Sequence, residues 1–342
     1  MKKKIIFIIN PISGTVSKAK IPSYVKAGID TKKFDYQFIN TEYAGHASLI
    51  AKQAAEEKVD IVVAVGGDGT INEVGRSLIN TKTAMAIIPC GSGNGLARHL
   101  CLPMNVKKCI DIINQCDIKS LDYGVINNHP FFCTCGMGFD AFISMQFAKA
   151  GKRGALTYVQ KVLEVGLSYK PEVYEIETNG ATLKHKAFLI SAANASQYGN
   201  NAYIAPQATM SDGLLDITLI EPFGVVDAAK VAIEMFNKTL DKNDKVKTFK
   251  CSHVHIHRQK PGVIHFDGDP IESSQDVDIS IVPKGIRIVM NPTFNIEDMK
   301  SNVAQTALSE VFSSFGHLRQ GVNNKGKRMQ SLYYSLLDKL KI

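Results

Sequence analysis

The chain has 342 residues, of which 45% are hydrophobic and 21% charged, and its formal net charge is +8. This balance is typical of a folded chain of about two domains and excludes an intrinsically disordered one. No stretch reaches the roughly 18 apolar residues that a membrane-spanning helix needs, and the seven cysteines form no CxxC pair, so we expect free thiols in a cytoplasmic protein.

Strand and helix signals alternate along residues 1–122. The apolar run at 5–9 follows three lysines, but it is too short for a signal peptide and predicts a buried parallel strand. Further strands are predicted at 36–39, 60–65 and 85–88, and helices at 44–57 and 71–78. This rhythm predicts an open, mostly parallel α/β domain.

The pattern changes in residues 123–283, where short β-type stretches are separated by Gly, Pro, Asn and Asp. One helix is expected at 155–167, and strands are expected at 173–178, 187–192, 215–220, 253–257, 263–266, 277–281 and 286–290. We therefore expect a β-rich second domain, built as a sandwich. The class as a whole is α/β plus β.

Residues 293–342 are predicted to form a basic, helical tail. Apolar residues recur on one face of two amphipathic segments, and residues 300–342 hold seven Lys or Arg against two acidic residues. Such a surface attracts nucleotide phosphates or anionic lipid. The chain has no tryptophan, and its basic residues lack aromatic interleaving, so nucleic acid is not an expected partner.

Two glycine-rich loops follow predicted strands. Gly66–Thr70 lets a ligand approach the backbone closely, and its N–H groups with the next helix N-terminus form an anion site. Asp68 makes sense beside a phosphate when Mg²⁺ lies between them. In Gly91–Gly95, Ser92 and Asn94 can bond phosphate or ribose, although Asn94 could also be a helix N-cap.

A third segment, Asn10–Gly14, follows the first strand and is expected at the same edge of the sheet. The glycine spacing is not G-x-G-x-x-G, and no P-loop or protein-kinase signature occurs. The loops still indicate nucleotide binding at the carboxyl ends of the parallel strands. An ordinary tight turn is the simpler alternative for each loop taken alone.

Together, Asn10–Gly14, Gly66–Thr70 and Gly91–Arg98 resemble the diacylglycerol kinase and sphingosine kinase catalytic-domain family, over residues 3–292. The first glycine loop is also shared with NAD kinases and phosphofructokinases. The resemblance implies an NAD kinase/phosphofructokinase-like first domain, a β-sandwich second domain and a final strand, about 284–292, that returns to the first domain. It implies ATP and Mg²⁺ as cofactors. The nucleotide would contact Asn10, Ser13, Gly14, Thr41, Gly66, Gly67, Asp68, Gly69, Thr70, Asn72, Gly91, Ser92 and Asn94.

The second domain adds matches to the same family. Gly138–Ala141 resembles a segment near the lipid cleft, and Asp267-Gly268-Asp269 stands where the family has Asp-Gly-Glu. The resemblance therefore implies Asp68, Asp267 and Asp269 as catalytic residues. Either Asp267 or Asp269 would accept the hydroxyl proton, and we favour Asp267 slightly.

The resemblance also implies metal positions. A structural Mg²⁺ would be held by the Asp212 side chain and by the carbonyls of Thr209 and Leu214, with Asp122 close to this network and Asp68 at the nucleotide. Three histidines at 253, 255 and 257 share one face of a predicted strand. No nearby cysteine or carboxylate in the sequence completes a metal set, so we interpret them as a solvated face.

The function that the resemblance implies is transfer of the γ-phosphate of ATP to a lipid hydroxyl. Ser144 stands where sphingosine kinases have an acidic residue for the substrate amine, which favours diacylglycerol over a sphingoid base. A lipid at a membrane surface is the expected partner, with peripheral attachment at the inner face and a homodimer left open. Two alternatives stand beside this function: an NAD kinase, and a catalytically silent nucleotide- or lipid-binding protein.

Overall fold

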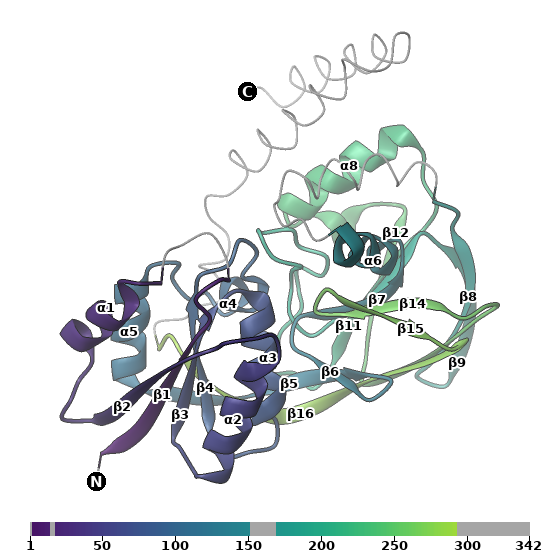
Figure 1. The fold of residues 1–342 in the computed structure, drawn as a ribbon. Coiled ribbons are helices and arrows are strands. Elements are labelled where there is room, and N and C mark those ends of the chain that lie inside the picture. The colour runs from purple at the N-terminus through teal and green to yellow at the C-terminus, as the bar shows by residue number, and fades with distance from the viewer. Residues whose placement is uncertain (1, 14–17, 151–168, 293–342) are drawn as a thin grey trace, which may run out of the picture.

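The computed structural model describes residues 2–13, 18–150 and 169–292 (Figure 1). Gly14, the helix expected at 155–167 and the tail at 293–342 lie outside the described residues. None of the described helices is long and apolar enough to cross a bilayer. None of the seven cysteines, all of which are described, forms a disulfide.

A parallel sheet forms the first domain. Its strands are β1 (Lys3–Ile9), β2 (Phe34–Asn40), β3 (Ile61–Gly66) and β4 (Ala84–Pro89), in the order β2-β1-β3-β4. Every residue of β3 and β4 is buried, as expected for strands covered on both faces. Helices α1 (Ile21–Gly28) and α5 (Val106–Gln115) pack together on one face, and α2 (His46–Glu56) and α3 (Asp68–Leu78) on the other (Figure 1).

The second domain is a sandwich. Its outer sheet contains β5 (Asp117–Ile126), β6 (His129–Phe131), β8 (Glu172–Thr178), β9 (Ala181–Ala187), β13 (His253–Arg258) and β16 (Asp276–Met290). The facing sheet has the order β12 (Val246–Cys251), β11 (Leu215–Ile220), β10 (Leu189–Ala193), β7 (Thr134–Gly138), β14 (Gly262–Phe266) and β15 (Asp269–Ser273). One apolar core of side chains from both sheets lies between them. The predicted α/β plus β-sandwich class is confirmed.

Helices cover the other face of the second sheet. They are α6 (Phe139–Ala150) and α8 (Val225–Phe236), followed by a short 3₁₀ turn at Leu240–Lys242. Side chains of these elements form a separate apolar cluster with Phe188, which lies between β9 and β10, and with Leu189 of β10. The remaining short helix, α4 (Gly95–His99), belongs to the first domain and follows the second glycine loop.

One long strand connects the two domains. β16 pairs antiparallel with β13 near its start and parallel with β4 near its end, at Ile288 and Met85. The expected division into strands at 277–281 and 286–290 was wrong. Pro283 and Gly285 suggest a break, but they accompany a register shift against β5 between Val282 and Ile286, and the strand continues beyond it.

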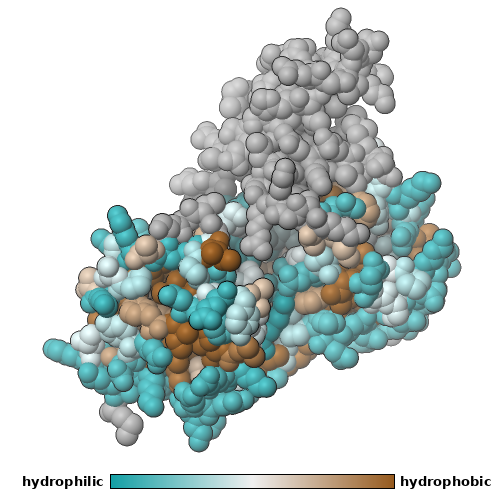
Figure 2. All heavy atoms as spheres, viewed as in Figure 1, coloured by the Kyte–Doolittle hydropathy of each residue, from teal (hydrophilic) through white to brown (hydrophobic). Residues whose placement is uncertain are grey.

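The surface is mostly hydrophilic in the orientation of Figure 2, with hydrophobic residues gathered in smaller patches on both domains. Few large apolar side chains of the described residues are exposed. They are Ile12, Tyr43, Leu49, Met104 and Leu183. Single exposed apolar residues of this kind are normal on a folded protein.

Candidate functional site

The carboxyl ends of β1, β3 and β4 meet at one edge of the parallel sheet. Backbone hydrogen bonds join Asn10 N to Val65 O at 3.1 Å and Cys90 N to Gly66 O at 2.7 Å. The Asn10 side chain donates to the Thr70 hydroxyl at 3.1 Å, and Thr41 N donates to Ile9 O at 2.9 Å. The segments predicted to contact a nucleotide therefore lie side by side.

The two glycine loops touch through their backbones. A Cβ placed on Gly91 would lie 2.7 Å from the Gly67 Cα, a separation that real Cβ atoms do not show. A Cβ on Gly67 would lie 3.2 Å from the Gly91 Cα. The glycines at these two positions are therefore required by the close approach of the loops, since neither has a positive φ.

Asp68 links the two loops by hydrogen bonds. Its two carboxylate oxygens accept the backbone N–H groups of Asn94 at 2.8 Å and Gly95 at 2.7 Å. A carboxylate offers about four acceptor positions, so two of them are used by these bonds. The remaining positions can still face a ligand at the loops.

The other predicted nucleotide residues differ in exposure. Asn94 occupies the N-cap position of α4, but its side chain makes no capping bond and instead closes the loop on itself, through the N–H and C=O of Gly91. Ser92 and Gly69 are exposed. The buried members with polar side chains are Ser13, Thr41, Thr70, Asn72 and Asn94.

A segment of the second domain, residues 194–200, packs against the second glycine loop. Asn200 N donates to Gly93 O at 3.1 Å, and a Cβ on Gly199 would lie 3.2 Å from the Gly93 Cα. Ser196 N donates to His99 Nδ1 at 3.1 Å, and burial lowers the pKa of His99 to about 4. The neutral imidazole therefore accepts this bond. The sequence contained no signal for this contact.

Asp267 is held by backbone donors. Its carboxylate accepts the N–H groups of Phe132, Cys133 and Thr134 at 2.8, 2.7 and 3.2 Å, and its side chain is 3% exposed. Burial raises the pKa of Asp267, while Arg76 and these backbone bonds act in the opposite direction. Most of its acceptor positions are therefore used within the protein.

Asp269, the alternative base, lies in a different environment. Its side chain is 55% exposed and pairs with Arg76 Nη1 at 2.8 Å. The same guanidinium lies 4.7 Å from the centre of the Phe266 ring and 3.9 Å from Asp267. Arg76, on α3 of the first domain, thus connects to the Asp267–Asp269 turn of the second.

Asp140, from the segment predicted near the lipid cleft, belongs to a buried polar cluster. Its Oδ2 lies 3.0 Å from His265 Nε2 and accepts the Tyr198 hydroxyl at 3.2 Å. Its Oδ1 accepts the backbone N–H of Ala141 at 2.8 Å. His265 is 2% exposed, and its buried Nδ1 has no hydrogen-bond partner within the part of the chain that the structure describes. Neither the histidine nor the tyrosine was singled out from the sequence.

Lys250 lies at the predicted structural metal site. The Lys250 ammonium lies 2.8 Å from Asp212 Oδ2 and 3.1 Å from Asp216 Oδ2. Both oxygens of Asp122 accept backbone N–H groups, those of Gly213 and Lys284 at 2.8 and 2.7 Å. In this arrangement the Lys250 ammonium neutralises the carboxylates of Asp212 and Asp216, so Mg²⁺ at this site would have to displace it.

No metal cluster is formed elsewhere in the described ranges, where no three His, Cys, Asp or Glu side chains are arranged to hold an ion. The Thr209 hydroxyl bonds to that of Ser211 at 3.1 Å, and Leu214 N donates to Asp212 at 3.1 Å. The predicted metal contacts of Asp68, Asp122, Thr209, Asp212 and Leu214 remain predictions.

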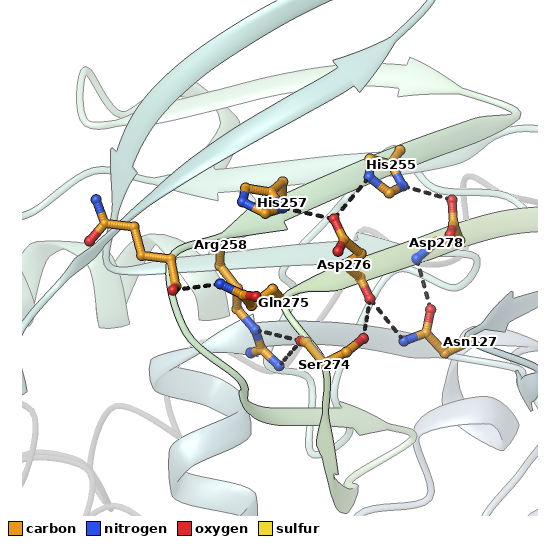
Figure 3. A network of polar contacts seen from close by, with 9 residues as sticks. Asn127, His255, His257, Arg258, Ser274, Gln275, Asp276 and Asp278 are labelled. Carbon is orange, nitrogen blue, oxygen red and sulfur yellow. Dashed lines mark hydrogen bonds and ion pairs between the residues drawn. The ribbon is translucent and has the colours of Figure 1, made fainter.

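The three histidines of β13 face carboxylates that are remote in sequence. His255 lies 2.9 Å from Asp278 and His257 lies 2.7 Å from Asp276, both aspartates being on the neighbouring strand β16 (Figure 3). The sequence analysis missed these partners because strand pairing brings them together. The bond to Asp278 raises the pKa of His255, and the bond to His257 lowers the pKa of Asp276.

Two family models and several curated proteins match most of the chain. Residues 4–126 match the family model of the diacylglycerol kinase catalytic domain, and residues 133–290 match that of the YegS C-terminal NAD kinase beta sandwich-like domain. The chain is 25% identical over 272 residues to the diacylglycerol kinase of Bacillus subtilis (strain 168), covering 78% of this chain and 90% of the relative. It is also 25% identical over 278 residues to the diacylglycerol kinase of Staphylococcus aureus (strain JH9), covering 79% and 87%.

A solved structure has the same fold. A crystal structure of a diacylglycerol kinase from Bacillus anthracis str. Sterne is similar with a TM-score of 0.67 and 20% sequence identity. The match covers 85% of this chain and 97% of the other. At this identity, the likeness concerns the fold alone.

Proposed function

The chain belongs to the diacylglycerol kinase-like family of lipid kinases, and we propose that it transfers the γ-phosphate of MgATP to the hydroxyl group of a lipid, with diacylglycerol as the preferred acceptor. The phosphate donor and the acceptor are the parts of this proposal that require an experiment. Both relatives described above are named diacylglycerol kinases, which supports that choice of acceptor.

One observation carries the proposal: the backbone contact between the two glycine loops at the ends of β3 and β4. The glycines of these loops can leave backbone N–H groups accessible to phosphate oxygens, and the N-terminus of α3 adds its partial positive charge. Asp68 fixes the loops relative to each other. Its unused acceptor positions suit water around the Mg²⁺ that arrives with ATP.

The contact between the domains supports transfer rather than binding alone. Phosphoryl transfer requires an acceptor held in line with the γ-phosphate. Asn200 of the second domain donates a hydrogen bond to Gly93, and Tyr198 and Gly199 lie close to the same glycine loop. An acceptor held by the second domain near them would therefore be close to the phosphates. The Ser144 hydroxyl donates to Asp140 O at 3.0 Å, and a neutral side chain there favours an acceptor without an amine.

The experiment is transfer of labelled phosphate from [γ-³²P]ATP with Mg²⁺ to lipids in detergent micelles. The panel contains diacylglycerol, monoacylglycerol, sphingosine, ceramide, phosphatidylglycerol and undecaprenol, with NAD as a soluble acceptor. We expect label on diacylglycerol and its loss in Asp68→Asn, whose fold is checked by circular dichroism. Label on NAD alone would make the protein an NAD kinase. ATP binding without label on any acceptor would make it a binding protein.

We also propose that the basic residues of 293–342 bring the protein to anionic membranes. The full chain and a full-length variant with Lys325, Lys327 and Arg328 changed to Glu are compared for co-sedimentation with phosphatidylglycerol vesicles. We expect weaker binding of the variant, and a larger difference at low salt. Equal binding of the two would reject this role for the tail.

A further inference from the structure

Lys18 is a buried lysine in the connection between β1 and α1. The residue is only 6% exposed and stands three positions before the start of α1 at Ile21. Lysine is almost never buried to this extent unless its charge is paired. The nucleotide contacts expected from the sequence do not include Lys18, and no part of the proposed function uses it.

The ammonium group of Lys18 has no partner among the described residues. It forms no ion pair with them, and it donates no hydrogen bond to them. The backbone is fixed nonetheless, because the carbonyl of Lys18 accepts the N–H of Ile21 at 2.9 Å. A buried charge without a partner costs free energy, so this position calls for an anion that the described part of the protein does not supply.

Arg258, the other lysine or arginine that is buried in the described ranges, shows how the fold treats a structural cation. It is 3% exposed, and its guanidinium donates five hydrogen bonds of 2.7–3.2 Å to backbone carbonyls. The structural cation is thus surrounded by acceptors, whereas Lys18 is not. The difference favours a partner for Lys18 that comes from outside the protein.

A ligand can reach the charged end of Lys18. Its Nζ is not one of the fully enclosed polar atoms that lack a partner, as Nζ of Lys238 is. Long basic side chains commonly bury their apolar stem and keep the charged group accessible. An anion can therefore approach the ammonium without displacing a protein group from it.

The charge of Lys18 lies close to the point where the two glycine loops meet. Burial raises the pKa of the Cys90 thiol, and the positive charge of Lys18 acts in the opposite direction. Because such interactions weaken with distance, the ammonium must be near Cys90. This cysteine directly precedes Gly91, and its N–H donates to Gly66 O at 2.7 Å.

The path of the backbone agrees with this placement. The connection that carries Lys18 begins at Asn10, whose side chain bonds to Thr70 at the end of the first glycine loop. It leads into α1, which packs against α5, and α5 contacts β4 (Figure 1). Lys18 therefore belongs to the edge of the sheet at which β4 and the second glycine loop meet.

The glycine loops contain no positively charged side chain of their own. In these loops and in the neighbouring Asn10–Ser13 segment, the only charged residue is Asp68. Arg98, which follows the second loop, uses its Nε on the Gly93 carbonyl at 3.0 Å. Backbone N–H groups and a helix N-terminus offer partial charges, while a nucleotide with two or three phosphates carries several full negative charges. A nearby ammonium supplies what these loops lack.

We propose that Lys18 binds the phosphate groups of the donor nucleotide. Without nucleotide its ammonium is buried and unpaired, and on binding the phosphate oxygens become its partners through charge-assisted hydrogen bonds. The positive charge also offsets the negative charge of the phosphates during transfer. This inference rests on the nucleotide-binding part of the proposed function and adds to it a residue outside the glycine motifs.

The binding test compares Lys18→Met with the matched variant Lys20→Met. Lys20 is exposed at the N-cap of α1, where its side chain makes no capping bond, so each variant loses one positive charge from the same segment. Calorimetric titration measures the Kd for MgADP and for adenosine. We expect Lys18→Met to raise the Kd for MgADP about 10–100-fold, the effect of one hydrogen bond between charged groups. Its Kd for adenosine, and both values for Lys20→Met, should equal those of the wild type.

Thermal unfolding separates a ligand-binding lysine from a structural one. Lys18→Met removes an unpaired buried charge, so we expect its Tm without nucleotide to equal or exceed that of the wild type. MgADP should raise the Tm of the wild type and of Lys20→Met, and raise that of Lys18→Met less at the same concentration. A lower Tm of Lys18→Met without nucleotide, together with an unchanged Kd for MgADP, would make Lys18 a structural residue and overturn the proposal.

A third measurement needs no variant. The wild type is treated with acetic anhydride, and peptide mass spectrometry follows the acetylation of each lysine. We expect MgADP to suppress acetylation of Lys18 and to leave that of Lys20 unchanged, while adenosine protects neither. Equal acetylation of Lys18 with and without saturating MgADP would overturn the proposal, even if Lys18→Met failed to fold.

The outcomes distinguish this inference from the proposed function. Label on a lipid, with a Kd for MgADP that Lys18→Met leaves unchanged, would keep the kinase and reject the role of Lys18. MgADP binding that depends on Lys18, without label on any lipid, would reject the lipid kinase and support Lys18 as a phosphate-binding residue. A wild type that binds neither MgADP nor MgATP would overturn both.

Discussion

The nucleotide loops and the Asp140–His265 cluster are built in opposite ways. The loops consist of neighbouring residues and act through their backbones, so that Gly67 and Gly91 matter because they lack side chains. The cluster acts through side chains, and its members come from positions 140, 198 and 265. A site built from neighbouring residues can be predicted from a short motif, whereas a site built from distant side chains depends on the fold.

The comparison is tested most strongly at Gly91. In Gly91→Ala, the new Cβ would lie 2.7 Å from the Gly67 Cα and 2.8 Å from Asn94 Oδ1. Because a backbone atom cannot rotate away, we expect the free energy of unfolding to fall by about 3 kcal/mol or more. Chemical denaturation measures this loss, and ATP binding should weaken with it.

Gly69→Ala is the matched control for stability. No atom lies within 4 Å of a Cβ at Gly69, which is a helical position of α3, and alanine is the better helix former by about 1 kcal/mol. We expect unchanged or slightly higher stability. Equal losses in the two variants would mean that any side chain in these loops is harmful, and that the contact between them is not the reason.

The second prediction separates Asp267 from Asp269. An Asn at 267 keeps one acceptor oxygen but places an amide donor against backbone N–H groups. We expect Asp267→Asn to lower the free energy of unfolding by about 2–3 kcal/mol. Asp269→Asn removes one exposed ion pair, for which we expect about 1 kcal/mol or less.

Urea denaturation of the two variants, followed by the lipid transfer assay on whichever stays folded, provides the measurement. If Asp267→Asn is as stable as the wild type and has lost its turnover, the carboxylate is a catalytic group as the sequence indicated. A loss of stability with residual turnover in Asp267→Asn would show that Asp267 stabilises the structure of the site and is not required for catalysis.

The difference between the two regions also explains what could be predicted from the sequence. The strands at 5–9, 60–65 and 85–88 were correctly placed because buried parallel strands are continuous apolar runs. β7 and β9 were not. β7 is Thr-Cys-Gly-Met-Gly, in which Gly136 makes room for the Asp140–His265 cluster. β9 is mostly exposed and contains two lysines, so it has no apolar alternation.

The same reasoning applies to single residues. Asp267 was identified as important from its motif, but its backbone partners lie more than 130 positions away. The histidines of β13 were correctly described as a strand face, although their aspartate partners were missed because they belong to another strand. Motifs indicate which residues matter, and topology decides what those residues contact.

The third prediction concerns the predicted metal site. Burial raises the pKa of Asp216, and Lys250 acts in the opposite direction. Lys250→Met should therefore lower the free energy of unfolding by about 1 kcal/mol at pH 7, a value discounted for the partly exposed lysine. The loss should fade as the pH falls through the pKa of Asp216, because a protonated carboxyl no longer needs the ammonium.

Thermal unfolding with and without EDTA tests whether a metal ion stabilises the same site. We expect the wild-type Tm to be unaffected by the chelator, since Lys250 supplies the positive charge for Asp212 and Asp216. A fall in Tm with EDTA that Mg²⁺ reverses would restore the structural metal implied by the resemblance, and would show that Lys250 is not the counter-ion.

The smallest expected effect lies on the exposed face of β13 and β16, where topology alone brings the charges together. Asp278 raises the pKa of His255, with smaller contributions from Asp276 and Glu177. His253 and His257 flank it on the same strand. A histidine with a raised pKa contributes stability that is fully present below its unfolded value, about 6.5, and is lost as the pH rises through the folded pKa.

An NMR titration of the histidine ring signals measures this directly, in the wild type and in Asp278→Asn. We expect the His255 titration to move to lower pH in the variant and the Tm difference between wild type and variant to vanish above the folded pKa of His255. His185, on β9 and outside this group of bonds, is the internal reference and should titrate alike in both proteins. An unchanged His255 titration would mean that strand pairing places these groups together without coupling their charges. The effect of chain topology on side-chain charges would then be limited to buried clusters such as that of Asp140 and His265.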